Sequence, residues 1–228
     1  MLKKLTTVTA FSLFSVMITQ AQGLLGKGLS SDDIVAGLKD ALNKGTEKST
    51  QKLSAVDGFF KDAAVKILLP PEAVKMETTL RDAGFGPQVD KAILDLNRAA
   101  EDAAKSAAPI FLNAIRNMSV ADGLGILRGS DTSATAYLRK STTAQLYAAF
   151  LPTIKNSLDK VGATKSWNTV VGLYNKIPFH KKINTDLPVY TTGRALDGVF
   201  YYVAVEEKGI RANPAGQADE LLKKVFGR

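Results

Sequence analysis

Apolar residues recur along this chain at the three- and four-residue spacing of helix faces, whereas alternation with a period of two never persists for more than a few residues. Turn and capping signals, mainly glycine, proline and clusters of serine, threonine and aspartate, separate the apolar stripes. The predicted helices cover residues 31–53, 72–83, 87–118, 120–127, 133–150, 154–161, 164–174, 190–211 and 217–226. The pattern therefore predicts an all-α fold.

Prolines mark the places where this helical pattern is disturbed. Pro109 lies inside the longest stripe, which resumes in phase after it, so we expect a kinked but unbroken helix. Pro152 is expected to interrupt the helix that it follows, and residues 177–189, with two more prolines, are expected to be irregular. We expect a single irregular multi-helix domain over residues 31–228. Its two long central helices are the one that contains Pro109 and the one at 190–211.

The first residues have the pattern of a cleavable signal peptide. A short basic stretch with two lysines precedes an apolar stretch at residues 8–18, and small residues follow at 19 and 21, the positions that a signal peptidase reads. The apolar stretch is too short for a membrane helix, which needs about 20 residues. An amphipathic first helix of a cytosolic protein is the alternative, but the segment has no polar face and no acidic residue. We therefore expect residues 1–21 to be a signal peptide, residues 22–30 to be a flexible leader, and the mature protein to be periplasmic or secreted.

The composition is that of a folded domain with a sizeable core, since 45% of the 228 residues are hydrophobic and 23% are charged. The formal net charge is +8, but the basic residues form no run with interleaved aromatics, so nucleic acid is not an expected partner. Weak attraction to anionic lipid headgroups is compatible with that charge. No later segment approaches a membrane-spanning length, and no transmembrane segment is expected.

Polar side chains interrupt the apolar stripes of the two long helices. Asn97, Arg98 and Glu101 lie beside the stripe of the first, and Asp197 and Glu206 lie on the second. If the two helices pack together, these carboxylates and the guanidinium meet in the interior. A pair of carboxylates in a cleft, Glu101 with Asp197 or with Glu206, has the chemistry for acid–base catalysis. The same spacings also arise from surface ion pairs or from a buried network that fixes helix register, and both interpretations stay open.

Other site chemistries are not supported by the sequence. Cysteine is absent and His180 is the single histidine, which leaves no thiol chemistry and no histidine-based metal site. The stretch that contains Asp122 and Asp131 superficially resembles a calcium loop, but apolar residues stand where an EF-hand needs ligands, and helix capping explains both aspartates better. No Gly-x-Ser-x-Gly motif and no nucleotide-binding glycine motif occurs. We expect no cofactor and no metal.

Several sequence blocks resemble a bacterial family catalogued as domain of unknown function 4197. The blocks are residues 97–101, 118–122, 126–137, 195–200, 206–211 and 221–227. The resemblance covers nearly the whole mature chain and implies a helical exported protein, but it brings no established activity. It also implies that nine residues act together, as a ligand-binding site or as a buried polar network: Asn97, Arg98, Glu101, Asp122, Asp131, Thr132, Tyr137, Asp197 and Glu206.

Three functions from different classes follow from these observations. The leading hypothesis is a protein that binds a small apolar or amphipathic ligand in a pocket between helices, with the polar residues at one end of the pocket. The rival is a structural or adaptor protein that acts on a partner protein of the cell envelope through its surface. The third is an acid–base hydrolase, towards which the sequence leans least.

Overall fold

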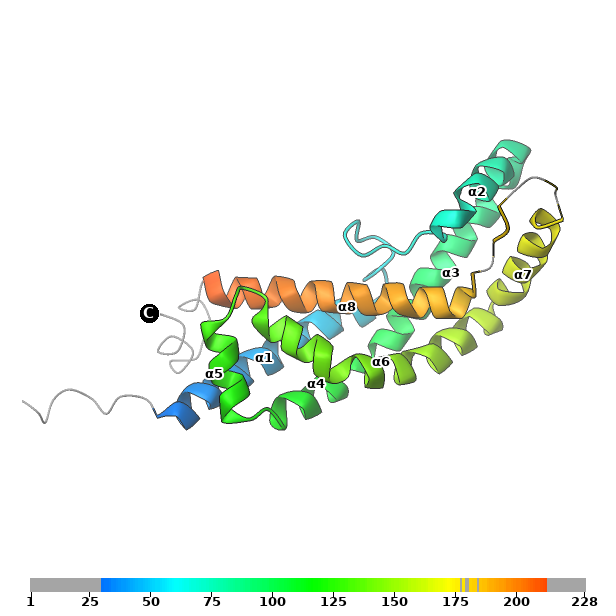
Figure 1. Cartoon of the computed structure of the whole chain (residues 1–228). Helices are drawn as coiled ribbons and strands as arrows, with labels where there is room; N and C mark the ends of the chain where they lie inside the picture. Colours follow the sequence, from blue (N-terminus) through cyan, green and yellow to red (C-terminus); the bar gives the residue numbers. More distant parts are fainter. Residues whose placement is uncertain (1–29, 177, 179–180, 184, 213–228) are drawn as a thin grey trace, which may run out of the picture.

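The computed structural model describes residues 30–176, 178, 181–183 and 185–212, and every regular element among them is helical (Figure 1). The prediction of an all-α fold is confirmed. The α-helices are α1 Ser31–Ser54, α2 Val74–Leu80, α3 Gly86–Ala104, α4 Ala107–Arg116, α5 Val120–Arg128, α6 Ser133–Lys160, α7 Ala163–Tyr174 and α8 Leu187–Ala212. A 3₁₀ turn at Pro71–Ala73 precedes α2, and a π turn at Arg81–Phe85 follows it. The predicted signal peptide, the leader before Ser30 and the helix at 217–226 lie outside the described residues.

The helices form an elongated bundle with α8 along its length (Figure 1). α8 packs most extensively against α6, which also packs along α3, while α1 contacts α8, α4 and α5. Figure 1 shows α2 and α7 together at one end of the bundle, beside the start of α8, and α5 at the other end. No helix in the described part of the chain is both long enough and apolar enough to span a membrane.

Two helix starts follow directly from local sequence. Ser30 caps α1: its hydroxyl accepts from the Asp33 N–H at 3.1 Å, and the Asp33 carboxylate accepts from the Ser30 N–H in return. Ser119 and Asp122 make the same reciprocal pair at the start of α5, where the hydroxyl accepts at 3.1 Å. Each of these reciprocal pairs is a capping box, which gives hydrogen-bond acceptors to backbone N–H groups that have no partner within the helix. The capping role expected of Asp122 is therefore confirmed.

Pro109 lies in the first turn of α4, so the prediction of one unbroken, kinked helix is wrong. α3 ends at Ala104 and α4 begins at Ala107. A proline ring clashes with the carbonyl four residues before it and has no N–H to donate to that carbonyl, which penalises a helix continued through Lys105. In the first turn of a new helix no intrahelical donor is needed, and the proline is tolerated there.

Pro152 and Pro188 both lie inside helices, although Pro152 is predicted to interrupt its helix and Pro188 is predicted to lie in the irregular stretch before the last long helix. α6 continues through Pro152, and the carbonyl that loses its donor belongs to Ala148, which is exposed and open to water. Pro188 is the second residue of α8, where a missing N–H costs nothing. The Asp186 carboxylate accepts from the Val189 N–H at 3.0 Å and caps that first turn.

The core is continuous along the bundle and contains the aromatic side chains of four phenylalanines. Phe59, Phe111, Phe150 and Phe200 are almost fully buried. The rings of Phe111 (α4) and Phe200 (α8) meet edge to face with centroids 5.9 Å apart. In this arrangement the positive edge of one ring faces the negative face of the other, which is favourable. Phe85 is different, because 49% of its surface is exposed at the end of the π turn.

Candidate functional site

Asn97 of α3 holds the irregular segment that leads into α2. The residue is fully buried. Its side-chain oxygen accepts from the Ile67 N–H at 2.8 Å, and its amide nitrogen donates to the Ile67 carbonyl at 2.8 Å and to the Ile93 carbonyl at 2.7 Å. An extended segment has no partner strand here, so the asparagine side chain supplies the two hydrogen bonds that a strand would supply.

Glu101, one turn further along α3, binds the backbone of the turn after α1. One carboxylate oxygen accepts from the N–H groups of Phe59 and Phe60, at 3.1 and 3.2 Å. The other accepts from the Arg98 guanidinium at 2.6 Å, and Arg98 also donates to the Asp57 carboxylate at 2.7 Å. Asn97, Arg98 and Glu101 thus come together as a network, and that network binds residues 57–67.

Asp197 and Glu206 of α8 lie outside this network. The Asp197 side chain is 55% exposed and pairs with Arg194 at 3.1 Å and with Arg139 at 3.9 Å. The Glu206 carboxylate pairs with Lys48 at 2.8 Å. Neither carboxylate shares a hydrogen-bond or ion-pair partner with Glu101 in the described residues, so these contacts give the acid–base pair of the hydrolase hypothesis no support.

The remaining predicted site residues surround the turn between α5 and α6. Asp122 belongs to the α5 capping box, Asp131 is exposed, and Thr132 is the N-cap of α6 without a side-chain capping bond. Tyr137 lies on the first turns of α6, and its burial together with the charge of Asp122 raises its pKa. No group of histidine, aspartate and glutamate side chains in the described residues is arranged to hold a metal ion.

Glu207 is a buried polar residue that the predicted set leaves out. It is 4% exposed, and it accepts from the Ala134 N–H at 2.9 Å, the Thr135 N–H at 2.8 Å and the Thr135 hydroxyl at 2.8 Å. Arg211 donates to the same carboxylate at 2.9 Å and to the Ile126 carbonyl at 2.9 Å. Glu207 therefore caps the N-terminus of α6 from α8, where a negative charge is favoured.

An apolar pocket of about 480 Å³ opens at the end of the bundle formed by α2, α3 and α7. The lining residues are Leu69, Met76, Leu80, Phe85, Gln88, Val89, Lys91, Ala92, Asp95, Leu96, Val161, Ala163, Ser166, Trp167, Val170 and Leu187. Its charged groups are Lys91 and Asp95, which form an ion pair at 2.6 Å. The indole N–H of Trp167 donates to the Thr185 carbonyl at 2.9 Å, which fixes the ring in the wall. Arg98 and Glu101 are not in the lining, so the pocket is separate from the polar network.

A family model described as a protein of unknown function, DUF4197, matches residues 28–227. The chain belongs to the DUF4197 family. The resemblance noted in the sequence blocks is therefore confirmed. No curated protein and no solved structure matches this chain significantly.

The ion pairs of Asp57 predict how the stability of this DUF4197 protein depends on pH. Lys61 and then Arg98 lower the pKa of Asp57 below its ordinary 3.8. A lowered pKa in the folded state gives stability that is fully present above the ordinary pKa and is lost as the pH falls through the folded value. We expect Asp57→Asn to lower the melting temperature at pH 7 and to have a smaller effect near pH 3, measured by circular dichroism.

Asparagine suits this experiment because Asp57 has a φ of +69°, a conformation that asparagine tolerates. Asp131→Asn is the matched control, since Asp131 is exposed and forms no salt bridge with a described residue. It should leave the melting temperature nearly unchanged at both pH values. A deficit of Asp57→Asn that stays constant between pH 7 and 3 would show that these ion pairs add no stability.

Proposed function

We propose that this protein is an exported binding protein that holds the apolar part of a small amphipathic molecule in the pocket between α2, α3 and α7. The observation that carries the proposal is the pocket itself. Its volume of about 480 Å³ falls within the range of about 300–1,000 Å³ of small-molecule sites. Side chains such as Met76, Leu80 and Trp167 form an apolar wall. Because contact between this wall and water is unfavourable, a ligand whose apolar part covers the wall would be bound favourably.

The polar lining residues support a ligand with one polar end. Gln88, Lys91 and Asp95 follow one another along the same face of α3, and Ser166 adds a hydroxyl from α7. A few hydrogen-bonding groups in a mostly apolar lining fix the orientation of a ligand. The Lys91–Asp95 ion pair has most of its lysine side chain in solvent, at 61% exposure, so Lys91 is free to turn towards a polar group of the ligand.

The first experiment is mass spectrometry of an organic extract from the protein purified gently from its own cells. One apolar or amphipathic molecule at near-equal molar amount is the expected result. Trp167 gives a second readout, because it is the single tryptophan of the chain and lies in the pocket wall. An empty extract, together with unchanged Trp167 fluorescence on titration with long-chain amphiphiles, would contradict the proposal.

Filling the pocket should abolish this binding. Ala92 lines the pocket from α3, and Ala92→Phe places a ring in the space that the ligand would occupy. We expect the amount of bound molecule to fall at least about tenfold while the far-ultraviolet circular dichroism stays that of the wild type. Ala144→Phe on the exposed side of α6 is the matched control and should keep the ligand. Equal retention by the two variants would exclude this pocket as the binding site.

A second candidate is the adaptor function, and one surface feature favours it. Tyr201 and Val205 lie one turn apart on α8 and are 46% and 41% exposed. Exposed apolar side chains that share a helix face are a common element of protein interfaces. Crosslinking in intact cells, compared between the wild type and Tyr201→Ser, tests this function separately from the pocket.

A further inference from the structure

The end of the bundle that contains the pocket, hereafter the pocket end, has an uneven distribution of charge. Residues 160–185 contain five lysines and no aspartate or glutamate. These lysines are Lys160, Lys165, Lys176, Lys181 and Lys182, and all five are exposed. None of them forms a salt bridge with a carboxylate in the described part of the chain. Two of them nevertheless have a carboxylate nearby, since Lys181 helps to lower the pKa of Glu72 and Lys160 helps to lower the pKa of Asp102. Lys165, Lys176 and Lys182 have no such partner among the described residues, and they give this edge its positive charge.

On the opposite side of the pocket, α2 and the start of α3 carry several acidic residues. Most of these carboxylates form ion pairs with neighbouring basic residues. Arg81 binds the carboxylates of Glu77 at 2.9 Å and of Asp90 at 2.8 Å. Lys91 binds Asp95 in the pocket. On the α7 side, the acidic residues next to the lysine segment are Asp159, which pairs with Lys155 at 2.6 Å, and Asp186, which caps α8. Lysines outnumber carboxylates there, so this is the more basic side of the pocket.

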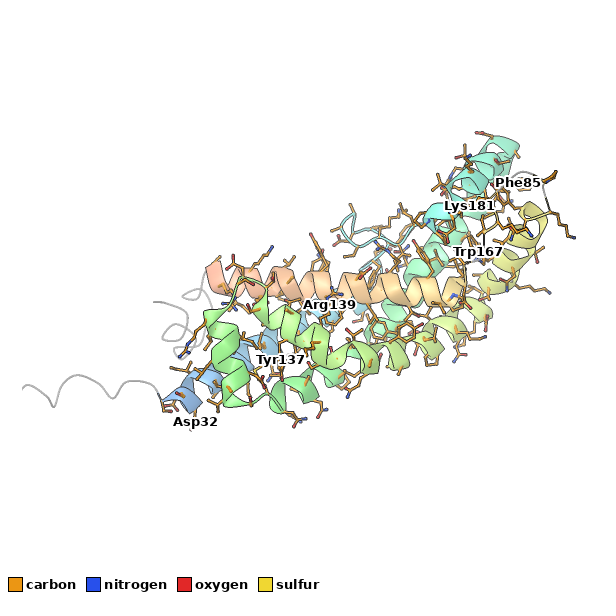
Figure 2. The ribbon with its side chains drawn as sticks, viewed as in Figure 1. Asp32, Phe85, Tyr137, Arg139, Trp167 and Lys181 are labelled. Carbon is orange, nitrogen blue, oxygen red and sulfur yellow. The ribbon has the colours of Figure 1, made fainter. Side chains whose placement is uncertain are left out.

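Exposed apolar side chains accompany the lysines. Phe85 and Val161 both line the pocket, and they are 49% and 51% exposed, which places them at its mouth. Gly84 has a φ of +87°, and this turn sets Phe85 at the tip between α2 and α3. Figure 2 shows Phe85, Trp167 and Lys181 at this same end of the molecule. Aromatic and aliphatic side chains next to lysines are typical of proteins that bind the surface of a bilayer.

We propose that the pocket end docks on an anionic lipid bilayer. The lysines of residues 160–182 bind the phosphate headgroups, and Phe85 and Val161 enter the interface, so that the pocket mouth opens onto the lipids. Anionic headgroups complement these exposed lysines, above all Lys165, Lys176 and Lys182, and each lysine contributes favourably near such a surface. The half-exposed apolar side chains favour a bilayer over a soluble acidic polymer, because only the bilayer removes them from water.

Vesicle binding by the mature protein, purified after export from its own cells, tests the electrostatic part. The wild type should sediment with vesicles of phosphatidylglycerol and phosphatidylethanolamine and should remain in solution with pure phosphatidylcholine. K165E/K176E/K182E is expected to weaken binding to the anionic vesicles at least about tenfold. R128E/K140E/K208E is the matched control, because it makes the same change in net charge at exposed residues outside the 160–185 segment. Absence of binding to anionic vesicles, or an equal loss in both variants, would overturn the proposal.

Insertion of Phe85 is tested by fluorescence quenching. Phe85→Trp in a Trp167→Phe background gives a single tryptophan at the mouth, and brominated phosphatidylglycerol should quench it. Tyr201→Trp in the same background is the control on α8 and should be quenched much less. Equal quenching at the two positions would contradict docking by this end. Binding to a DNA duplex or to polyglutamate, without binding to vesicles, would also overturn the proposal.

Docking on a bilayer and ligand binding in the pocket can be tested separately. If K165E/K176E/K182E keeps its extractable molecule but no longer sediments with vesicles, the two properties are separate and both proposals stand. If the wild type binds anionic vesicles but yields an empty extract, docking stands and the ligand proposal fails.

Discussion

Glu207→Ala should destabilise the protein by about 3–5 kcal/mol, the range found when one partner of a buried ion pair is removed. The Glu207 carboxylate binds two backbone N–H groups at the start of α6, the Thr135 hydroxyl and Arg211. Alanine leaves the buried N–H groups of Ala134 and Thr135 without an acceptor and removes a carboxylate bound by Arg211. Urea denaturation followed by circular dichroism measures the loss, which is a large part of the 5–15 kcal/mol of a typical domain.

The neighbouring Glu206→Ala is a matched control for this prediction. Glu206 pairs with Lys48, whose side chain is 73% exposed, and surface pairs of this kind contribute about 1 kcal/mol or less. Glu207→Gln keeps an acceptor oxygen but loses the charge, so we expect an intermediate stability and a measurable transition even if Glu207→Ala does not fold. Equal effects of Glu206→Ala and Glu207→Ala would show that the cap on α6 is unimportant.

Asn97→Ala should destabilise the protein by about 2–4 kcal/mol, because two buried backbone groups lose their partners. The N–H and the carbonyl of Ile67 both bind the Asn97 side chain, and Ile67 is itself 1% exposed. Water cannot replace the side chain without opening the core around it. The midpoint of urea denaturation gives the size of the effect, and hydrogen exchange of the Ile67 amide should become faster.

Asn113→Ala is the comparison for this effect. Asn113 is an exposed asparagine on α4 that bonds only weakly to Asn117, at 3.3 Å, so its removal should change stability by about 0.5 kcal/mol or less. Asn97→Asp is informative as well, since aspartate accepts from the Ile67 N–H but, when ionised, cannot donate to the Ile67 carbonyl. Wild-type stability of Asn97→Ala would mean that the segment around Ile67 is held in some other way.

The sequence predicts the helices well because their signals are local. The capping boxes at Ser30 and Ser119 need only residues three positions apart, and the apolar stripes recur within a few turns. The prolines are harder to interpret, because the same residue breaks a helix in its interior and opens one in its first turn. Pro109 and Pro188 differ from the prediction for this reason.

The candidate site is less predictable, because its contacts join residues far apart in the chain. The buried polar cluster of α3 is visible in the sequence as Asn97 and Glu101 beside an apolar stripe. Their partners, the backbone of Ile67 and of Phe59, lie 30 and 42 residues away in irregular segments that no periodicity describes. Glu207 could have been selected over Glu206 from helix phase alone, since it shares a face with the buried Val203 and Ile210.

The position of the pocket is likewise not predictable from local sequence patterns. An apolar pocket between helices is expected from the sequence, but the expected place is beside Arg98 and Glu101. The observed pocket depends on how the turn at Gly84 folds α2 back along α3 and on how α7 packs opposite them. Those are tertiary contacts, and the local pattern does not determine them.

Asn97 and Glu101 bind the irregular segment through its main chain alone, and this has a consequence for how sequences of the family can diverge. The bonds require N–H groups at Phe59, Phe60 and Ile67, but they do not depend on the side chains at those positions. Substitution of neighbouring exposed positions is therefore compatible with the same backbone path, whereas proline at any of the three is excluded. Two side chains of α3 thus fix the course of this segment, and the freedom to vary its side chains is confined to its exposed positions, since Phe59 and Ile67 are also part of the core.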